Sequence, residues 1–193
     1  MELAILARHG ESAFSARALV NGDAAIAGPL TSVGEEEARL LGDAISGDSI
    51  DLCVTSDFER TRQTADLALA GRDVPRLVVP ELNDPLYGEF EGGSLVDYRG
   101  WAHSHGSGEP PPGAGESRRV IVERYGRGFG IVLERPEPTV LVVVHSLPIA
   151  YVLAGGVPRV APVVEHATAY RLRAGELATA VGCLETWLAA PSW

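Results

Sequence analysis

Residues 3–12 read LAILARHGES, a run of five apolar residues followed by the polar group Arg8, His9 and Gly10. A short continuous apolar run is typical of a strand that is buried on both faces of a sheet. The residues after it would lie in the loop at the carboxyl end of that strand. Ligands of open α/β sheets bind beyond the carboxyl ends of the strands. We therefore expect this strand to present Arg8 and His9 to a binding site.

Further apolar runs alternate with helical patterns along the chain. The additional strands are predicted at residues 51–55, 76–79 and 139–144. The helices are predicted from a cap at Thr31 onward, over 60–70, and over 116–133, where Gly126, Gly128 and Gly130 weaken the pattern. The last segments, 169–173 and 180–188, are predicted to add strands or an edge hairpin. This alternation predicts a three-layer α/β/α fold, in which helices cover both faces of a mainly parallel sheet with an antiparallel edge strand.

Length and composition limit the architecture and the partners. With 193 residues, of which 46% are hydrophobic, the chain is expected to form one domain over residues 1–193. Its net charge of -10 argues against a nucleic acid or an anionic membrane as partner. The first residues show no basic leader, so we expect a cytoplasmic protein. The composition leaves a homo-oligomer open.

Two cysteines lie in apolar segments that are interpreted as strands. Cys53 and Cys183 are far apart and lack the spacing of metal ligands, so we expect both to be reduced core residues. Between residues 104 and 115 the density of Gly, Pro and Ser indicates an irregular loop that borders a site.

Polar elements follow each of the predicted parallel strands. His9 follows the first strand, Ser56 and Arg60 the second, the loop of residues 82–92 the third, and His145 the fourth. Because the carboxyl ends of parallel strands meet at one edge of a sheet, these elements are expected to converge.

The converging residue types suit phosphoryl transfer without a metal ion. Neutral imidazole is a competent nucleophile near pH 7, and arginines close to His9 would lower its pKa by like-charge repulsion. Arg8 and Arg60 offer planar donors that match phosphate oxygens, and His145 adds a further donor. We expect neither a metal ion nor a cofactor.

These motifs resemble the signature of the histidine phosphatase superfamily, in its phosphoglycerate-mutase-like branch. The similarity rests on the stretches at residues 8–12, 29–38, 56–65, 82–92 and 115–117 and on His145, and it extends from Leu3 to Tyr170. It implies that the fold is phosphoglycerate-mutase-like.

The resemblance also implies roles for individual residues. His9 would accept the phosphoryl group, Arg8, Arg60 and His145 would form the phosphate pocket, and Asp84 would be the proton donor. Asp84 stands where the family usually has glutamate; the alternative acids are Glu81, Glu89 and Glu91, and a turn-forming aspartate before Pro85 is the structural interpretation. Ser15 is assigned to phosphate binding, at a position where relatives often carry asparagine. Leu19 replaces a frequent arginine, and Ser146 and Leu147 stand where glycines are usual.

Other residues have two interpretations each. Arg118 and Tyr87 are candidate substrate contacts, although an exposed helix face and aromatic packing explain them equally. His103, His105 and His166 lack a carboxylate or thiol at ligand spacing, so we expect solvent-exposed loop residues rather than metal ligands.

The sequence therefore predicts a phosphatase that hydrolyses a small phosphomonoester through a phosphohistidine at His9. The first alternative is a phosphoglycerate mutase, but Pro85 stands where mutases tend to carry arginine and the chain is short for a mutase. The second alternative is a phosphate-binding domain that has lost turnover through the changes at Ser15, Asp84 and Ser146.

Overall fold

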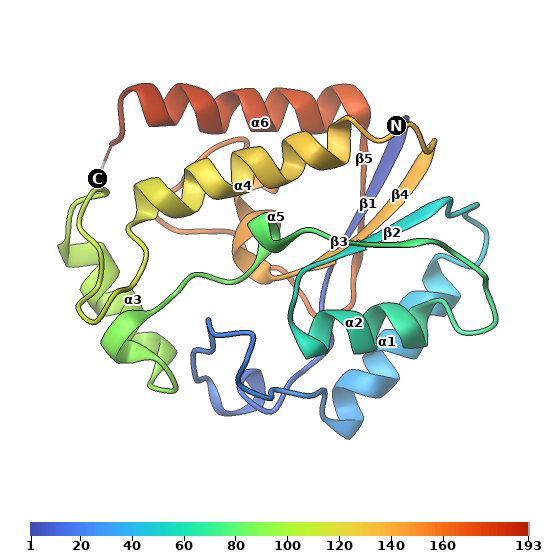
Figure 1. Ribbon diagram of the computed structural model, residues 1–193, viewed down its shortest axis with the longest axis horizontal. Coiled ribbons are helices and arrows are strands. Elements are labelled where there is room, and N and C mark those ends of the chain that lie inside the picture. Colours follow the sequence, from blue (N-terminus) through green and yellow to red (C-terminus); the bar gives the residue numbers. More distant parts are fainter. Residues whose placement is uncertain (193) are drawn as a thin grey trace.

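A computed structural model describes residues 1–192 and contains a five-stranded sheet between two layers of helices (Figure 1). The strands are β1 (Leu3–Arg8), β2 (Leu52–Thr55), β3 (Arg76–Val78), β4 (Thr139–Val144) and β5 (Ala169–Arg173). They lie in the order β3-β2-β4-β1-β5, and only β5 runs antiparallel to its neighbour. The predicted three-layer architecture with a mainly parallel sheet and an antiparallel edge strand is confirmed.

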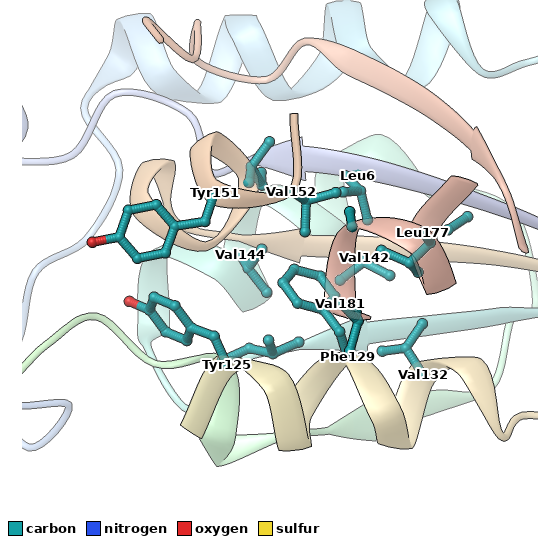
Figure 2. Packing of buried hydrophobic residues seen from close by; sticks show 14 of the residues in the cluster. Leu6, Tyr125, Phe129, Val132, Val142, Val144, Tyr151, Val152, Leu177 and Val181 are labelled. Atoms are coloured by element: carbon teal, nitrogen blue, oxygen red, sulfur yellow. The ribbon is translucent and has the colours of Figure 1, made fainter. Parts of the chain in front are cut away.

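Both faces of the sheet are buried, as the continuous apolar runs indicate. Along β1, Ile5 and Ala7 face the cluster beneath α1 (Ser32–Ala44) and α2 (Glu59–Ala68). Ala4 and Leu6 belong to the opposite cluster, beneath α4 (Arg118–Leu133), α5 (Ser146–Leu153) and α6 (Ala174–Ala189). Figure 2 shows this second cluster, in which aromatic rings of α4 and α5 pack with aliphatic residues of the sheet. The alternation is what the period of two along a strand requires.

Two helices begin directly after a residue whose side chain caps the helix. The side chain of Thr31 accepts a hydrogen bond from the Gly34 backbone at the start of α1, and Ser117 does the same for Val120 at the start of α4. Short 3-10 turns occur at Ser15–Arg17 (η1), Pro80–Leu82 (η2) and Gly88–Phe90 (η3). Among residues 1–192, no helix is long and apolar enough to cross a bilayer.

The prediction of strands at residues 180–188 is wrong, because this segment is part of α6. The buried residues of α6, Leu177, Ala180, Val181 and Leu184, recur every three or four positions, which is a helical period. Cys183 is therefore a partly exposed helix residue and not a strand residue, whereas Cys53 is buried in β2; both are free thiols. Besides α6, two further helices were not predicted, α3 (Leu95–Ser104) and α5.

The glycines of α4 differ in what surrounds them. A Cβ on Gly128 would lie 2.7 Å from Cδ2 of the fully buried Leu82 in η2, whereas one on Gly130 would meet nothing within 4 Å. Gly128 thus allows α4 to approach the turn that leads into the loop containing Asp84.

We predict opposite effects for alanine at these two positions. Gly128→Ala should lower the free energy of unfolding by about 1–3 kcal/mol through overpacking against Leu82. Gly130→Ala should raise it by up to about 1 kcal/mol, because alanine is the better helix former. Urea denaturation of both variants measures this difference, and equal stabilities would contradict the packing described.

Candidate active site

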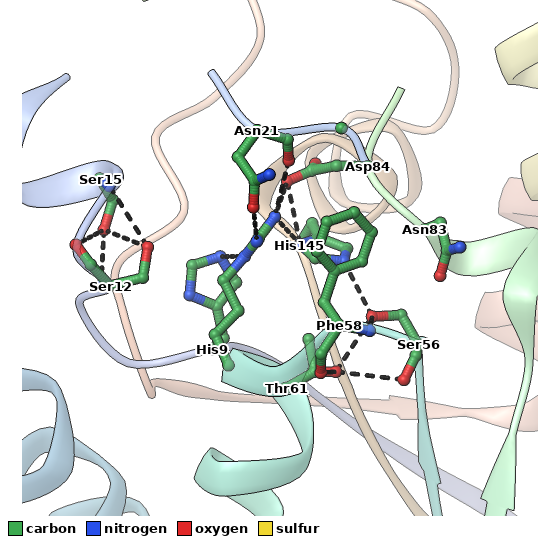
Figure 3. Close-up of polar contacts among 12 residues, drawn as sticks. His9, Ser12, Ser15, Asn21, Ser56, Phe58, Thr61, Asn83, Asp84 and His145 are labelled. Carbon is green, nitrogen blue, oxygen red and sulfur yellow. Dashed lines mark hydrogen bonds and ion pairs between the residues drawn. The ribbon is translucent and has the colours of Figure 1, made fainter. Parts of the chain in front are cut away.

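The carboxyl ends of β1, β2 and β4 meet above a cavity of about 160 Å³ that we call the His9 cavity. His9 directly follows β1, and its backbone N–H donates to the Val144 carbonyl at the end of β4, 2.9 Å away. Arg60 lies in the first turn of α2, and His145 joins β4 to α5. Figure 3 shows His9 facing Asn21, Asp84 and His145. The polar lining of the cavity includes Arg8, His9, Ser12, Ser15, Arg60 and Asp84.

Hydrogen bonds fix the tautomer of His9. Its side chain is buried, and Nδ1 lies 2.7 Å from the Gly10 carbonyl, which can only accept, so Nδ1 carries the proton. Nε2 accepts from Nε of Arg60 at 3.1 Å and therefore holds the lone pair. The Gly10 backbone in turn donates to Thr64 of α2. The atom that can act as nucleophile is Nε2.

The surroundings of His9 favour its neutral form. Burial is the largest cause that lowers its pKa well below 6.5, and the positive charge of Arg60 is the next. Because only the neutral ring has a free lone pair, this depression keeps Nε2 nucleophilic in mildly acidic solution.

Arg60 connects the polar groups of the site. Its guanidinium is 3% exposed and donates to His9, to the side-chain and backbone oxygens of Asn21 at 2.6 and 3.1 Å, and to Asp84 at 2.8 Å. Asn21 was missed by the sequence analysis, because it lies in a loop away from any strand end and carries no pattern of its own.

Asp84 and His145 lie within ion-pair distance of each other, beside Arg60. Oδ2 of Asp84 lies 3.0 Å from Nδ1 of His145, whose Nε2 is 2.9 Å from the Ser56 hydroxyl. Burial raises the pKa of the Asp84 carboxyl, but His145 and Arg60 together lower it more, and the net pKa falls well below its ordinary value. Burial also lowers the pKa of His145, against the opposing effect of Asp84. The Asp84 carboxylate can only accept, so a neutral His145 carries its proton on Nδ1 and accepts from Ser56 through Nε2.

Some of the other predicted site residues line the cavity, and others do not. Arg8 and Ser15 line the cavity; Arg8 donates to the Val164 carbonyl, and the Ser15 hydroxyl accepts from the Ser12 backbone. Tyr87 also lines it. His145 is fully buried behind Asp84 and is not part of the lining. Arg118 is outside the lining as well and donates to the Ala102 carbonyl in α3.

None of the alternative acids approaches His9 as Asp84 does. Glu81 and Glu91 are partly buried and Glu89 is exposed, and none of the three lines the cavity. A carboxylate oxygen of Glu91 accepts from the Gly22 backbone at 2.7 Å, which ties two loops together.

Arg124 of α4 holds the loop that contains Asp84. Its guanidinium donates to the backbone carbonyls of Glu81, Asn83 and Asp84 at 2.9–3.3 Å. It also forms an ion pair with Glu116 at 2.7 Å, and both side chains are only 14% exposed. This role of Arg124 could not be predicted, because three of its partners are backbone atoms.

The expectation that all three remaining histidines are exposed loop residues is wrong for each of them, either in exposure or in location. The ring of His166 lies 5.9 Å from that of His9, its side chain is 20% exposed, and its backbone pairs with Arg8. These contacts with the end of β1 keep it from solvent. His103 is exposed but lies in the last turn of α3. His105 lies in a loop but is only partly exposed, because its ring stacks on Trp101.

His9, Asp84 and His145 could together offer three ligand atoms to a metal ion, since these atoms lie within 4.8 Å of one another. The guanidinium of Arg60, however, already donates to His9 and Asp84. A cation between them would lie against this positive charge, so the set of donors suits an anion better.

We predict that the charge of Arg60 contributes to the low pKa of His9. In the unmodified protein Nε2 should remain unprotonated as the pH falls through 6.5, and Arg60→Met should raise the pKa of His9 toward that value without reaching it, because burial persists. Arg62→Met, on an exposed position of the same helix, is the control. Imidazole ¹⁵N NMR against pH measures both, and titration of His9 at its ordinary pKa in the unmodified protein would contradict the prediction.

We also predict that Arg124 stabilises the fold. Arg124→Met leaves Glu116 and three carbonyls without their donor and should lower the free energy of unfolding by about 3 kcal/mol. Arg127→Met removes only an exposed ion pair with Glu123, so a change within about 0.5 kcal/mol is expected. If urea denaturation shows similar losses of unfolding free energy for the two variants, the contacts of Arg124 with the loop do not stabilise the fold as predicted.

The sequence matches one known protein family and several relatives. Residues 4–161 match the model of the histidine phosphatase superfamily (branch 1). The adenosylcobalamin/alpha-ribazole phosphatase of Escherichia coli is 40% identical over 86 residues, which are 45% of this chain and 41% of that protein. A 2,3-bisphosphoglycerate-dependent phosphoglycerate mutase of Methylobacterium sp. is 35% identical over 138 residues, 63% of each chain. The chain thus spans about two fifths of the length of the first of these relatives.

Solved structures match over a larger part of the chain. The alpha-ribazole phosphatase from Shigella flexneri superposes with a TM-score of 0.75 and 26% identity, over 88% of this chain and 89% of that one. Bacillus stearothermophilus YhfR gives a TM-score of 0.76 at 23% identity, over 88% and 89%, and supports the fold alone.

Proposed function

Because the chain belongs to branch 1 of the histidine phosphatase superfamily, we propose that it is a phosphatase that hydrolyses a small-molecule phosphomonoester through a phosphohistidine at His9. The observation that supports this most is the state of His9, whose Nε2 holds a lone pair at the cavity while Nδ1 is bound to the Gly10 carbonyl. We also propose that residues 1–193 form one catalytic domain that acts in the cytoplasm.

Substrate binding would begin with an exchange of anions. In the free site the Asp84 carboxylate accepts from both Arg60 and His145. A phosphate dianion that enters beside Arg8 offers oxygens to the same donors and takes the place of the carboxylate. His145, which lies behind Asp84, then becomes a phosphate ligand. Each fixed donor to the transferring group is worth about 3 kcal/mol in the transition state.

The same exchange prepares Asp84 as a proton donor. Its pKa is low in the free site because the proton of His145 and the charge of Arg60 stabilise the carboxylate. Once phosphate has taken these donors, the pKa of Asp84 rises and the carboxyl can hold a proton. Nε2 of His9 then attacks phosphorus, the bond from phosphorus to the ester oxygen breaks, and Asp84 gives its proton to that oxygen.

Hydrolysis of the phosphohistidine completes the cycle. The Asp84 carboxylate takes a proton from water, the water oxygen attacks phosphorus, and the bond to Nε2 breaks. Throughout, Nδ1 of His9 keeps its proton and its bond to the Gly10 carbonyl, which stabilises the positive ring of the intermediate. The net reaction is ester plus water to alcohol plus orthophosphate.

We predict that Asp84 matters most when the leaving group is poor. Asp84→Asn should lower kcat/KM, which reports formation of the phosphohistidine and not its hydrolysis, about 10²–10⁴-fold for an alkyl phosphate, the usual range for a general acid, and much less for p-nitrophenyl phosphate, whose oxygen leaves without a proton. Glu89→Gln, at an exposed acid of the same loop, is the matched control, and His9→Ala should abolish phosphate release from both esters. A loss that is equal for the two esters would exclude Asp84 as the proton donor.

The relatives named as mutases make phosphoryl transfer back to substrate the second candidate. Incubation with 3-phosphoglycerate separates the two functions, since a phosphatase releases orthophosphate and a mutase forms the isomeric phosphoglycerate. Faster isomerisation than release would overturn the proposal. Orthophosphate binding without turnover of any ester would instead indicate a phosphate-binding domain.

A further inference from the structure

Part of the lining of the His9 cavity is apolar, and its chemistry restricts the substrate. Six apolar or aromatic residues, which we call the apolar wall, line the cavity together with the polar groups: Phe14, Ala18, Leu19, Val20, Tyr87 and Leu95. Phosphate would bind beside His9 Nε2, Arg8 and Arg60, so the leaving group of a bound ester would meet the rest of the lining, of which this wall is the larger part.

Backbone hydrogen bonds between two segments hold the wall in place. Val20 donates to the Gly93 carbonyl and accepts from the Gly92 backbone at 3.0 and 3.1 Å, and Leu95 donates to the Ala18 carbonyl at 2.9 Å. Leu19 pairs with Ser94 in the same two-segment arrangement. The backbone at Leu19 and Leu95 is therefore held in place. A small movement of these segments would not replace the two leucine side chains in the lining with polar ones.

The distribution of charge in the lining also restricts which substrates can bind. The chain has 16 arginines and no lysine, and of the arginines only Arg8 and Arg60, the residues expected to bind phosphate, line the cavity. Arg17, in η1, is exposed and donates to the Ala13 carbonyl, and its guanidinium carbon lies 5.7 Å from the centre of the Phe14 ring. A carboxylate on the leaving group would lose water against the apolar wall and gain no cation in return, which is unfavourable.

We propose that this protein selects phosphomonoesters whose leaving group is uncharged and apolar where it faces the wall, and that Leu19 is a specificity-determining residue. The inference rests on the proposed phosphatase function, which it deepens by defining the class of substrate. An ester with a second anionic group next to the phosphate, such as a phosphorylated sugar acid, falls outside this class.

Three phosphate esters with leaving groups of equal size test the proposal. Isobutyl phosphate, 2-phosphoglycolamide and 2-phosphoglycolate place an apolar, a neutral polar and an anionic group at the same position. We expect kcat/KM to be highest for isobutyl phosphate and at least tenfold lower for 2-phosphoglycolate, a difference of 1.4 kcal/mol or more. The corresponding phosphonates, in which CH₂ replaces the ester oxygen, should show the same order of Kd in calorimetry.

Leu19→Arg should shift the preference toward 2-phosphoglycolate by tenfold or more, because it places a cation in the apolar wall. Leu19→Met, with a side chain of similar length and no charge, should retain the original order. An unmodified protein that prefers the glycolate compounds, or a Leu19→Arg variant with an unchanged preference, would overturn the inference.

The two readouts separate this inference from the function on which it rests. If the esters are hydrolysed without the expected order, the phosphatase function stands and the specificity is wrong. If no ester is hydrolysed but the phosphonates bind in the expected order, the specificity stands and the phosphatase function is wrong.

Discussion

The buried guanidinium of Arg60 is the charge on which the organisation of the site depends. A buried charge is unfavourable unless it is paired and hydrogen-bonded, and Arg60 meets this requirement with His9, Asn21 and Asp84. Each of these bonds also constrains the partner. The bond from Nε requires a lone pair on Nε2 of His9, and the bond to Asp84 holds the carboxylate beside His145. One cation thus orients the nucleophile, adds to the effect of burial that keeps it neutral, and positions the acid.

The sheet explains why these residues meet although they are far apart in the sequence. β1, β2 and β4 are adjacent and parallel, so the residues that follow them lie at one edge. Backbone contacts strengthen this arrangement, since His9 is bound to the end of β4 and Gly10 to Thr64 of α2. The Asp84 loop is bound to the end of β2 through hydrogen bonds between Asn83 and Asp57, and Arg124 of α4 holds its backbone from the opposite layer.

Much of the fold and the centre of the site follow from the sequence, because both depend on short apolar runs and on the residues that end them. β1 and β4 are such runs, and the parallel arrangement then brings His9, Arg60 and His145 together. At residues 180–188 the hydrophobic period was misjudged. The segment mixes small and large apolar residues, and the helical spacing of its buried positions was therefore not recognised. Asn21 and Arg124 could not be predicted, since their partners are set by how loops pack in three dimensions. His145 was predicted correctly at its strand end, but its burial behind Asp84 depends on the loop conformation.

The covalent intermediate provides the most direct test of how Arg60 and Gly10 orient His9. Protein quenched in alkali during turnover of a phosphomonoester should carry one acid-labile phosphoryl group on His9, and ³¹P–¹H correlation should assign it to Nε2, because Nδ1 is occupied by the Gly10 carbonyl. A phosphoryl group on Nδ1, or on His145 or His166 in place of His9, would contradict the geometry, as would turnover without any phosphohistidine.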